Sequence, residues 1–318
     1  MNEELKYEPI NACDGYRRSR EGDTIPDQSL SVRLTASCDN SCSFCIAAED
    51  MKISHKFDKE ALVKQTIDSG TDTVSIIGGE PFLFMKRLIE YLDDIRDKVE
   101  SIYITTSLPI TLERQWDEFK NAMSKIDFMT ISIQDMDYAR NNDLMNSKKK
   151  FDRVSLLKRI LEDEDLNEKV TVNMNLVKEG IDTEDKFFEA LYLLDDWGLK
   201  HLRINELMHA PKQYVNFENM LGLELPPPYS GGCKTKMHFI DGMDIYLKRS
   251  CFMTEETLGA TEEEVDKLEY KAAHVDSYMQ PGWRILYEHG EYDHKWRHVR
   301  PEGRKKLPLT VVNESQNK

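Results

Sequence analysis

The sequence predicts an α/β protein: a partial (βα)6 barrel followed by a small α+β appendage. Two observations support this fold class. Six short apolar segments alternate with five helical patterns, and the alternation then stops near Met208. Strands that alternate with helices form parallel sheets, and six such units are too few to close an eight-unit barrel. We therefore expect an N-terminal extension over residues 1–29, the partial barrel over residues 30–215 and a C-terminal region over residues 216–318.

The six predicted strands are short and rich in Val, Ile, Leu or Thr, residue types that favour extended backbone. They span Ser31–Thr35, Thr73–Ile77, Ser101–Thr105, Phe128–Ile133, Val170–Leu176 and His201–Asn205. The five predicted helices carry apolar residues at the spacing of a helix with one buried face. They span Lys59–Ser69, Met85–Val99, Leu112–Met123, Val154–Asp163 and Glu184–Trp197. Asp58 directly precedes the first of them and is a residue type that caps helices.

Turn-forming residues mark the end of the predicted barrel. Pro226-Pro227-Pro228 and Gly231-Gly232 interrupt the chain after the last strand. The segment Lys236–Lys248 predicts a small hairpin, because Asp241-Gly242 at its centre suits a two-residue turn. A helix is expected over Glu262–Ala273.

The composition disfavours several classes of protein. The net charge of −15 argues against non-specific nucleic-acid binding, because such binding depends on basic residues that neutralise phosphates. No apolar run approaches the roughly 18–20 residues that span a bilayer, and the N-terminus lacks the pattern of a secretory signal. We expect no nucleic-acid partner, no membrane attachment and a cytoplasmic location. Basic residues do gather at Lys148-Lys149-Lys150, where they indicate solvated surface or a docking patch for an acidic electron carrier.

Three of the six cysteines, Cys38, Cys42 and Cys45, lie directly after the first predicted strand. In a reducing cytosol, grouped cysteines are more often metal ligands or reactive thiols than disulfides. A [4Fe–4S] cluster is usually held by four thiolates, so three would leave one iron open to the amino and carboxylate groups of an amino acid. Structural zinc needs four ligands, and the nearest histidine, His55, is ten residues past Cys45. The triplet therefore predicts a [4Fe–4S] cluster.

This CxxxCxxC spacing, with Phe44 directly before the last cysteine, resembles the hallmark of the radical SAM superfamily. The resemblance covers residues 30–210. It implies an oxidoreductase-type reaction in which an electron enters the cluster and cleaves S-adenosylmethionine (SAM) into methionine and a 5′-deoxyadenosyl radical. The radical then removes a hydrogen atom from an unactivated carbon. It also implies a low-potential electron donor such as flavodoxin or ferredoxin.

The resemblance also implies which residues contact SAM. Gly78-Gly79-Glu80-Pro81 follows the second predicted strand and looks like the family's GGE motif, which binds the SAM amino group. The glycines would allow close backbone approach to the ligand, and Glu80 would accept hydrogen bonds from the ammonium group. The other residues predicted to contact SAM are Phe44, Thr105, Ser132, Gln134, Asn173 and Met208, the last of them against the adenine.

Polar residues on the last two predicted strands are candidates for substrate binding. Asn175, Arg203 and Glu206 are predicted to contact substrate, although Arg203 and Glu206 could instead form a buried ion pair. The last strand has a distant resemblance to that of the molybdopterin-pathway GTP cyclase. An arginine and a lysine of that cyclase align with Ser31 and Thr171, which argues against GTP cyclisation.

Cys233 and Cys251 flank the predicted hairpin and resemble the start of a SPASM or shortened twitch domain, where such cysteines begin a second cluster site. That pattern needs further cysteines downstream, and none follows Cys251. Cys13 could supply a third ligand, as could one of four histidines: His274, His289, His294 or His298. Alternatively, the hairpin is a remnant without metal, or one thiol donates a hydrogen atom to a product radical.

Three functions remain open at this stage. We favour a radical SAM enzyme that dehydrogenates or rearranges a small molecule, because the 29-residue extension is shorter than the leader-recognition domain of many peptide maturases. The alternatives are a peptide-modifying maturase or epimerase, and a non-catalytic sensor that binds the cluster and SAM. The intact cysteine triplet, Phe44 and Gly78-Gly79-Glu80 favour an enzyme over a sensor.

Overall fold

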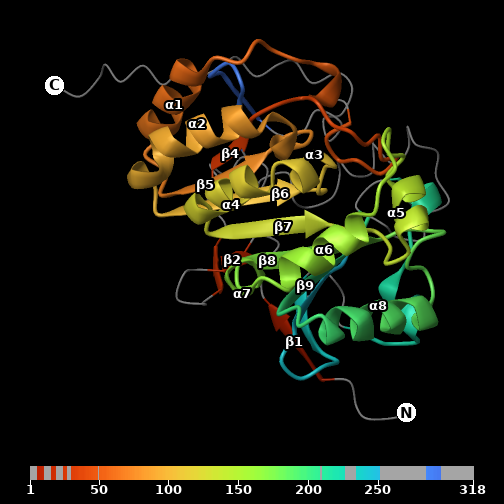
Figure 1. The fold of residues 1–318 in the computed structure, drawn as a ribbon. Coiled ribbons are helices and arrows are strands. Elements are labelled where there is room, and N and C mark those ends of the chain that lie inside the picture. The colour runs from red at the N-terminus through yellow and green to blue at the C-terminus, as the bar shows by residue number, and fades with distance from the viewer. Residues whose placement is uncertain are drawn as a thin grey trace, which may run out of the picture.

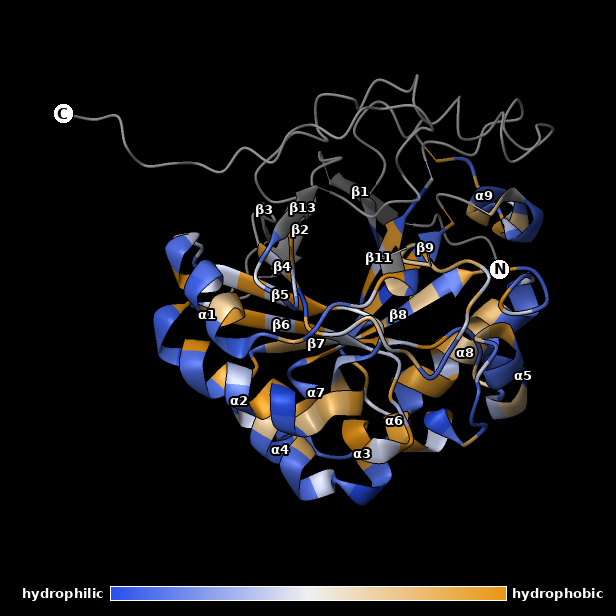
Figure 2. Ribbon diagram, turned by 90° about the horizontal axis from the view of Figure 1, so that it is seen from above, coloured by the Kyte–Doolittle hydropathy of each residue, from blue (hydrophilic) through white to orange (hydrophobic). Residues whose placement is uncertain are grey.

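The computed structural model describes residues 6–10, 16–18, 24–26, 30–48, 50–207, 210–225, 234–250 and 284–294. Within these ranges one sheet dominates, with the strand order β1-β10-β11-β9-β8-β7-β6-β5-β4-β12-β13. The order runs from β1 to β13 without returning to its start, so the sheet is curved but not closed (Figure 2). The predicted α/β class and open barrel are confirmed.

All six predicted strands are present, and their bounds differ from the expected ones by at most two residues at either end. They are β4 (Leu30–Arg33), β5 (Thr73–Ile77), β6 (Ser101–Thr106), β7 (Phe128–Ser132), β8 (Val170–Leu176) and β9 (His201–Glu206). Neighbours among them pair in parallel and in chain order. The carboxyl ends of all six strands therefore meet along one edge of the sheet, where ligands of α/β proteins bind.

Strands from the chain termini extend this array on both sides. The hairpin predicted over Lys236–Lys248 is confirmed as β10 (Lys234–His238) and β11 (Asp244–Lys248), and β11 adds to β9 in parallel. On the other side β12 (Arg284–Tyr287) adds to β4 in parallel and pairs with β13 (Tyr292–His294). Near the N-terminus, β1 (Lys6–Ile10) pairs with β10, and β2 (Tyr16–Arg18) pairs with β3 (Thr24–Pro26). The division into three segments stays a prediction. All the described strands except β2 and β3 belong to one sheet, so the sheet itself does not mark the boundaries.

The helices cover the convex face of the sheet (Figures 1 and 2). The five predicted ones correspond to α1 (Lys59–Asp68), α2 (Met85–Ile95), the pair α3 (Thr111–Arg114) and α4 (Trp116–Lys125), α6 (Arg153–Leu161) and α8 (Glu184–Asp196). The third prediction was one helix, but the backbone breaks at Gln115 (φ −115°, ψ 42°). The predicted cap is confirmed, because the Asp58 side chain accepts a hydrogen bond from the Ala61 N–H.

The 3-10 turn η3 (Arg96–Lys98) follows α2 within the range predicted for one helix, Met85–Val99. Shorter helices that the sequence did not predict connect these elements. They are α5 (Tyr138–Leu144), α7 (Glu164–Asn167), α9 (Phe217–Leu221) and the 3-10 turns η1 (Asp50–Lys52), η2 (Pro81–Phe84) and η4 (Pro211–Gln213). Each has five residues or fewer except α5, and such lengths carry little periodic signal. The helix expected over Glu262–Ala273 lies outside the described residues.

Strand alternation separates a helix-packed face from a polar one. On β8 and β9, buried residues such as Met174 and Ile204 lie against Phe187 and Ala190 of α8. The residues between them are partly exposed and therefore face the concave side of the sheet. On β7, β8 and β9 this concave set is Phe128, Thr130, Ser132, Thr171, Asn173, Asn175, His201, Arg203 and Asn205. In a parallel sheet with helices on both faces, such positions would be apolar. Most of the residues on this concave face are polar, so the face is suited to bind polar molecules.

Candidate active site

The three cysteines lie on the loop that leaves β4 at the carboxyl edge of the sheet; we call Cys38–Cys45 the cluster loop. All three thiols are partly exposed and none is in a disulfide. A turn closes the end of the loop, where the Cys45 N–H donates to the Cys42 carbonyl at 3.1 Å. Among the described residues, no three His, Cys, Asp or Glu side chains converge tightly enough to ligate one metal ion. The thiolates of a [4Fe–4S] cluster bind different iron atoms, so the ligands of a cluster need not converge on one point.

The thiols affect one another electrostatically. Burial is the main cause that raises the pKa of Cys38 to about 12, and the neighbouring Glu80, Asp39 and Cys45 contribute in the same direction. Burial likewise raises the pKa of Cys42 to about 12, with added contributions from Cys45 and Cys38. The thiols are therefore close enough to affect one another and hold their protons at neutral pH. A bound metal displaces such protons, since the thiolate is the ligand.

The two glycines after β5, Gly78 and Gly79, pack against the residues that lead into the cluster loop. Gly78 has φ +150°, and a Cβ there would lie 2.5 Å from the Thr35 carbonyl oxygen. A Cβ on Gly79 would lie 2.1 Å from the Ser37 carbonyl oxygen, closer than atoms can approach. The Gly79 and Glu80 N–H groups donate to the Thr35 and Ser37 carbonyls, both at 2.8 Å. The glycines were predicted to approach a ligand closely. In the structure they closely approach Thr35 and Ser37, which lead into the cluster loop.

Glu80 joins the ends of β5 and β6. Its side chain has no exposed surface. Its carboxylate accepts hydrogen bonds from Thr106 Oγ1 at 2.9 Å and from the Ser107 N–H and Oγ at 2.6 and 2.8 Å. Burial outweighs these bonds and raises the pKa of Glu80 to about 7. In this arrangement the carboxylate is occupied by protein donors, and its contact with the SAM amino group stays a prediction.

The other residues predicted to contact SAM fall into two groups. Thr105, Ser132 and Asn173 lie on the concave face near the carboxyl ends of their strands, with Ser132 directly beside Asn173 in the sheet register. Gln134 and Phe44 are instead buried. Met208 lies outside the described residues.

The two buried residues hold backbone segments in place. Gln134 Oε1 accepts from the Asn175 N–H at 2.9 Å, which ties the loop after β7 to β8. Phe44 packs in a small apolar cluster with Val177, Leu207 and Tyr214. Phe44 therefore anchors the cluster loop over the ends of β8 and β9, and SAM contact by either residue stays a prediction.

An asparagine bridge connects β8 and β9 on the concave face. Asn205 Nδ2 donates to Asn173 Oδ1 at 2.7 Å and to Asn175 Oδ1 at 3.3 Å. Arg203 lies in register between Asn173 and Tyr246 of β11. Asn205 was not predicted, although its spacing of two residues from Arg203 places it on the same face.

Glu206 lies on the other face of β9, and one of its predicted roles needs correction. It is 3% exposed, and its carboxylate accepts from the Phe217 N–H, the Ser250 N–H and Tyr214 Oη. These contacts fasten the chain after β11 to the end of β9. The alternative of an ion pair with Arg203 is wrong, because residues three apart on a strand point to opposite faces. The carboxylate of Glu206 is occupied by these protein donors, and its contact with substrate stays a prediction.

The predicted second site cannot be placed in the fold. Cys13, Cys233 and Cys251 lie outside the described residues, as do His274 and His298. His289 is described, and its ring stacks on His55 with centroids 3.8 Å apart while its Nε2 lies 3.2 Å from Glu291.

Residues 32–191, half of the chain, match the family model described as Radical SAM superfamily. No curated protein matches the chain in sequence. In the part of the chain that the structure describes, none of the helices is both long and apolar enough to cross a membrane.

Several solved structures resemble the fold at low sequence identity. A radical SAM methyltransferase from Sphaerobacter thermophilus is 14% identical with a TM-score of 0.48, and the match covers 77% of each chain. Coproporphyrinogen III oxidase (HemN) from Escherichia coli is 15% identical with a TM-score of 0.41, over 58% of this chain and 45% of that one. Native anSMEcpe with bound AdoMet and Cp18Cys peptide is 16% identical with a TM-score of 0.40, over 55% of this chain. The present chain spans about half the length of anSMEcpe.

Proposed function

The chain belongs to the radical SAM superfamily, and we propose that it cleaves SAM reductively and abstracts a hydrogen atom from a small-molecule substrate. The observation that carries the proposal is the placement of Cys38, Cys42 and Cys45 on one loop beside a polar concave face. When bound there, a [4Fe–4S] cluster supplies one electron that divides SAM into methionine and a 5′-deoxyadenosyl radical, and this radical takes the hydrogen atom.

The chain's own residues hold and orient these groups. The three thiols would hold the cluster, and the amino and carboxylate groups of SAM would complete its ligands. Thr105, Ser132 and Asn173 offer hydroxyl and amide groups to SAM on the neighbouring strands β6, β7 and β8. These roles follow from the side of the sheet on which the residues lie.

The substrate is proposed to lie beside SAM, over β8, β9 and β11. Asn175 and Arg203 are partly exposed on this part of the concave face, and Asn205 adds an amide. Amide and guanidinium groups close together bind a compact polar molecule by several directed hydrogen bonds. Dehydrogenation or rearrangement of such a molecule is our preferred reaction, and modification of a peptide is the alternative outcome of a substrate screen.

Further features of the proposal concern partners and location. A low-potential donor such as flavodoxin or ferredoxin would supply the electron, and the protein would act in the cytoplasm. A second cluster at Cys233, Cys251 and Cys13 remains part of the proposal. Iron analysis separates the cases, because one cluster contributes about four iron atoms per chain and two contribute about seven to eight.

The test is anaerobic reconstitution followed by incubation with SAM and dithionite, with 5′-deoxyadenosine measured by mass spectrometry. The wild-type protein should release 5′-deoxyadenosine, and Cys38→Ala should not. Ser41→Ala is the matched control, because Ser41 is an exposed residue on the same loop and should leave the product unchanged. Wild-type product no higher than that of Cys38→Ala would overturn the enzyme proposal and favour a sensor.

A further inference from the structure

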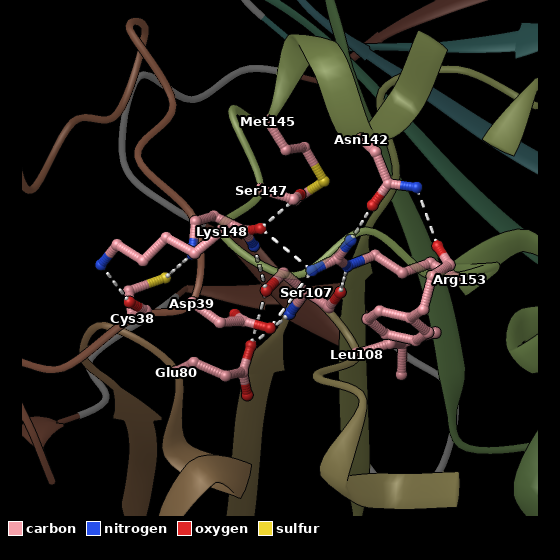
Figure 3. A network of polar contacts seen from close by, with 12 residues as sticks. Cys38, Asp39, Glu80, Ser107, Leu108, Asn142, Met145, Ser147, Lys148 and Arg153 are labelled. Atoms are coloured by element: carbon pink, nitrogen blue, oxygen red, sulfur yellow. Dashed lines mark hydrogen bonds and ion pairs between the residues drawn. The ribbon is translucent and has the colours of Figure 1, made fainter. Parts of the chain in front are cut away.

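A fully buried arginine lies against the outer side of the cluster loop. Arg153 is the first residue of α6, and it is 0% exposed. Its guanidinium donates to Asp39 Oδ2 at 3.2 Å and to Asn40 Oδ1 at 3.0 Å, both on the cluster loop. It also donates to Asn142 Oδ1 and, at 3.1 Å, to the Ser107 carbonyl (Figure 3). One side chain therefore connects the cluster loop to α5 and to the end of β6.

The guanidinium of Arg153 forms an ion pair with Asp39, its one acidic hydrogen-bond partner among the described residues, and its other three acceptors are neutral amide or carbonyl oxygens. The carboxyl of Glu80 also lies near enough to affect the pKa of Arg153. Burial lowers the pKa of Arg153, but a guanidinium starts so high that it stays charged at any pH the protein tolerates. A cation thus persists beside the cluster loop, in a site that water screens poorly.

The segment that carries Arg153 contacts the thiol-bearing chain at several points. We call residues 145–153 the α5–α6 segment. The Met145 carbonyl accepts from the Ser41 N–H at 3.1 Å and from Cys42 Sγ at 3.4 Å. Lys148 Nζ donates to the Cys38 carbonyl at 2.8 Å, and the Lys148 N–H donates to the Asp39 carbonyl at 2.8 Å. The α5–α6 segment therefore packs along the cluster loop and places a second cation, Lys148, in contact with it.

Asn40 links Arg153 to one of the cluster-loop thiols. Arg153 and Ser147 Oγ both donate to Asn40 Oδ1, and Asn40 Nδ2 donates to Ser107 Oγ at 2.8 Å. The Asn40 N–H in turn donates to Cys38 Sγ at 3.4 Å. Hydrogen bonds to cluster sulfurs and nearby charge are the features by which proteins set the reduction potential of iron–sulfur clusters.

We propose that Arg153 is a positioning residue that holds the cluster loop and raises the reduction potential of the cluster bound by Cys38, Cys42 and Cys45, with Lys148 adding a smaller, salt-dependent contribution. The inference rests on the proposed function, since it needs the cluster in place. Reduction adds one negative charge to the cluster, and a buried cation stabilises the reduced form more than the oxidised form. Lys148 is exposed, so mobile ions weaken its effect.

The decisive experiment compares two charge changes of opposite sign within the same ion pair. Midpoint potentials of the reconstituted holoprotein are measured by redox titration with electron paramagnetic resonance. Arg153→Gln should lower the potential, and Asp39→Asn should raise it. Arg153→Lys, which keeps the charge, should stay nearer the wild type than Arg153→Gln. A merely structural role predicts loss of iron in both variants without opposite shifts, and that result would overturn the proposal.

A surface pair keeps the test decisive if the buried variants lose iron. Lys148→Gln should lower the potential at low salt and approach the wild-type value at high salt. Lys149→Gln is the matched control, because Lys149 is an exposed lysine next in sequence and no hydrogen bond joins it to the cluster loop among the described contacts. Two results together would overturn the proposal: equal midpoint potentials for Lys148→Gln and Lys149→Gln, and a midpoint potential of Arg153→Lys that differs from that of the wild type. A wild-type protein that takes up no cluster would instead refute the proposed function itself.

Discussion

Two fully buried arginines hold two different seams of this molecule. Arg33, at the end of β4, pairs with Glu288 beyond β12 through two hydrogen bonds of 2.8 and 2.9 Å, and its guanidinium lies 4.2 Å from the centre of the Tyr287 ring. We call this contact the strand seam. Arg153 spreads its hydrogen bonds over four acceptors on three parts of the chain, and we call that contact the loop seam.

The difference shows how one residue type can serve assembly or chemistry. At the strand seam a bidentate carboxylate matches the guanidinium in charge and shape, so the pair is nearly neutral and joins N-terminal to C-terminal chain. At the loop seam the guanidinium divides its hydrogen bonds between one carboxylate and three neutral acceptors, and both charges of the Arg153–Asp39 pair lie at the cluster loop. We expect the strand seam to govern stability, and the loop seam to govern cluster binding and potential.

The largest effect should come from closing the space under the cluster loop. Gly79→Ala places a methyl group 2.1 Å from the Ser37 carbonyl oxygen, so the loop must move. We expect iron content after reconstitution to fall to that of Cys38→Ala. Gly70→Ala is the control, because Gly70 precedes β5 at the opposite edge of the sheet and a methyl group there would meet no atom within 4 Å. Full iron content in Gly79→Ala would show that the glycine contact does not position the thiols.

Breaking the strand seam should cost stability and spare the cluster potential. Arg33→Met leaves the Glu288 carboxylate buried without its partner, which should lower the free energy of unfolding by about 3–5 kcal/mol. The double variant Arg33→Met/Glu288→Met should recover part of that loss, since it removes both charges of the pair. Urea unfolding measures both. A changed midpoint potential of the cluster in folded Arg33→Met would contradict the expectation that the strand seam affects stability and not the cluster.

Glu80, whose partner Ser107 also contacts Arg153, should make the free energy of unfolding depend on pH. Its pKa rises from 4.5 to about 7 in the folded protein because of burial. Between these values the folded protein keeps a proton that the unfolded chain has released, so stability should fall as pH rises from about 4.5 to about 7. The full change is about 3 kcal/mol, from roughly 1.4 kcal/mol per pKa unit. Urea unfolding of Glu80→Gln should lack this slope, and an identical slope in both proteins would assign it elsewhere.

Two helix caps offer the smallest and most closely matched comparison. Asp58 caps α1 near the strand seam, and Asp137 caps α5, which leads into the α5–α6 segment. Replacing either with Ala should lower the free energy of unfolding by about 1 kcal/mol. Iron uptake should slow in Asp137→Ala and stay unchanged in Asp58→Ala. Equal uptake in the two variants would indicate that α5 does not help to place the cluster loop.

Local patterns were enough to predict much of the barrel. Five-residue runs of β-branched and apolar residues, such as Thr73–Ile77, and amphipathic repeats, such as that of α2, encode structure in neighbouring residues. The short helix α5 was missed because seven residues carry too little periodic signal. The contacts of Glu206 could not be predicted, because its hydrogen-bond partners come from residues 8, 11 and 44 positions away.

The sequence by itself determined the cofactor chemistry, since three cysteines at fixed spacing on one loop identify a cluster without knowledge of any distant residue. Only the tertiary structure decided what surrounds that loop. Gly79 meets Ser37, and Arg153 meets Asp39 and Asn40 across more than a hundred residues. Such contacts arise when parallel strands bring their carboxyl ends to one edge, and no local pattern records which loops meet there. The buried cation beside the thiols was therefore visible only after folding.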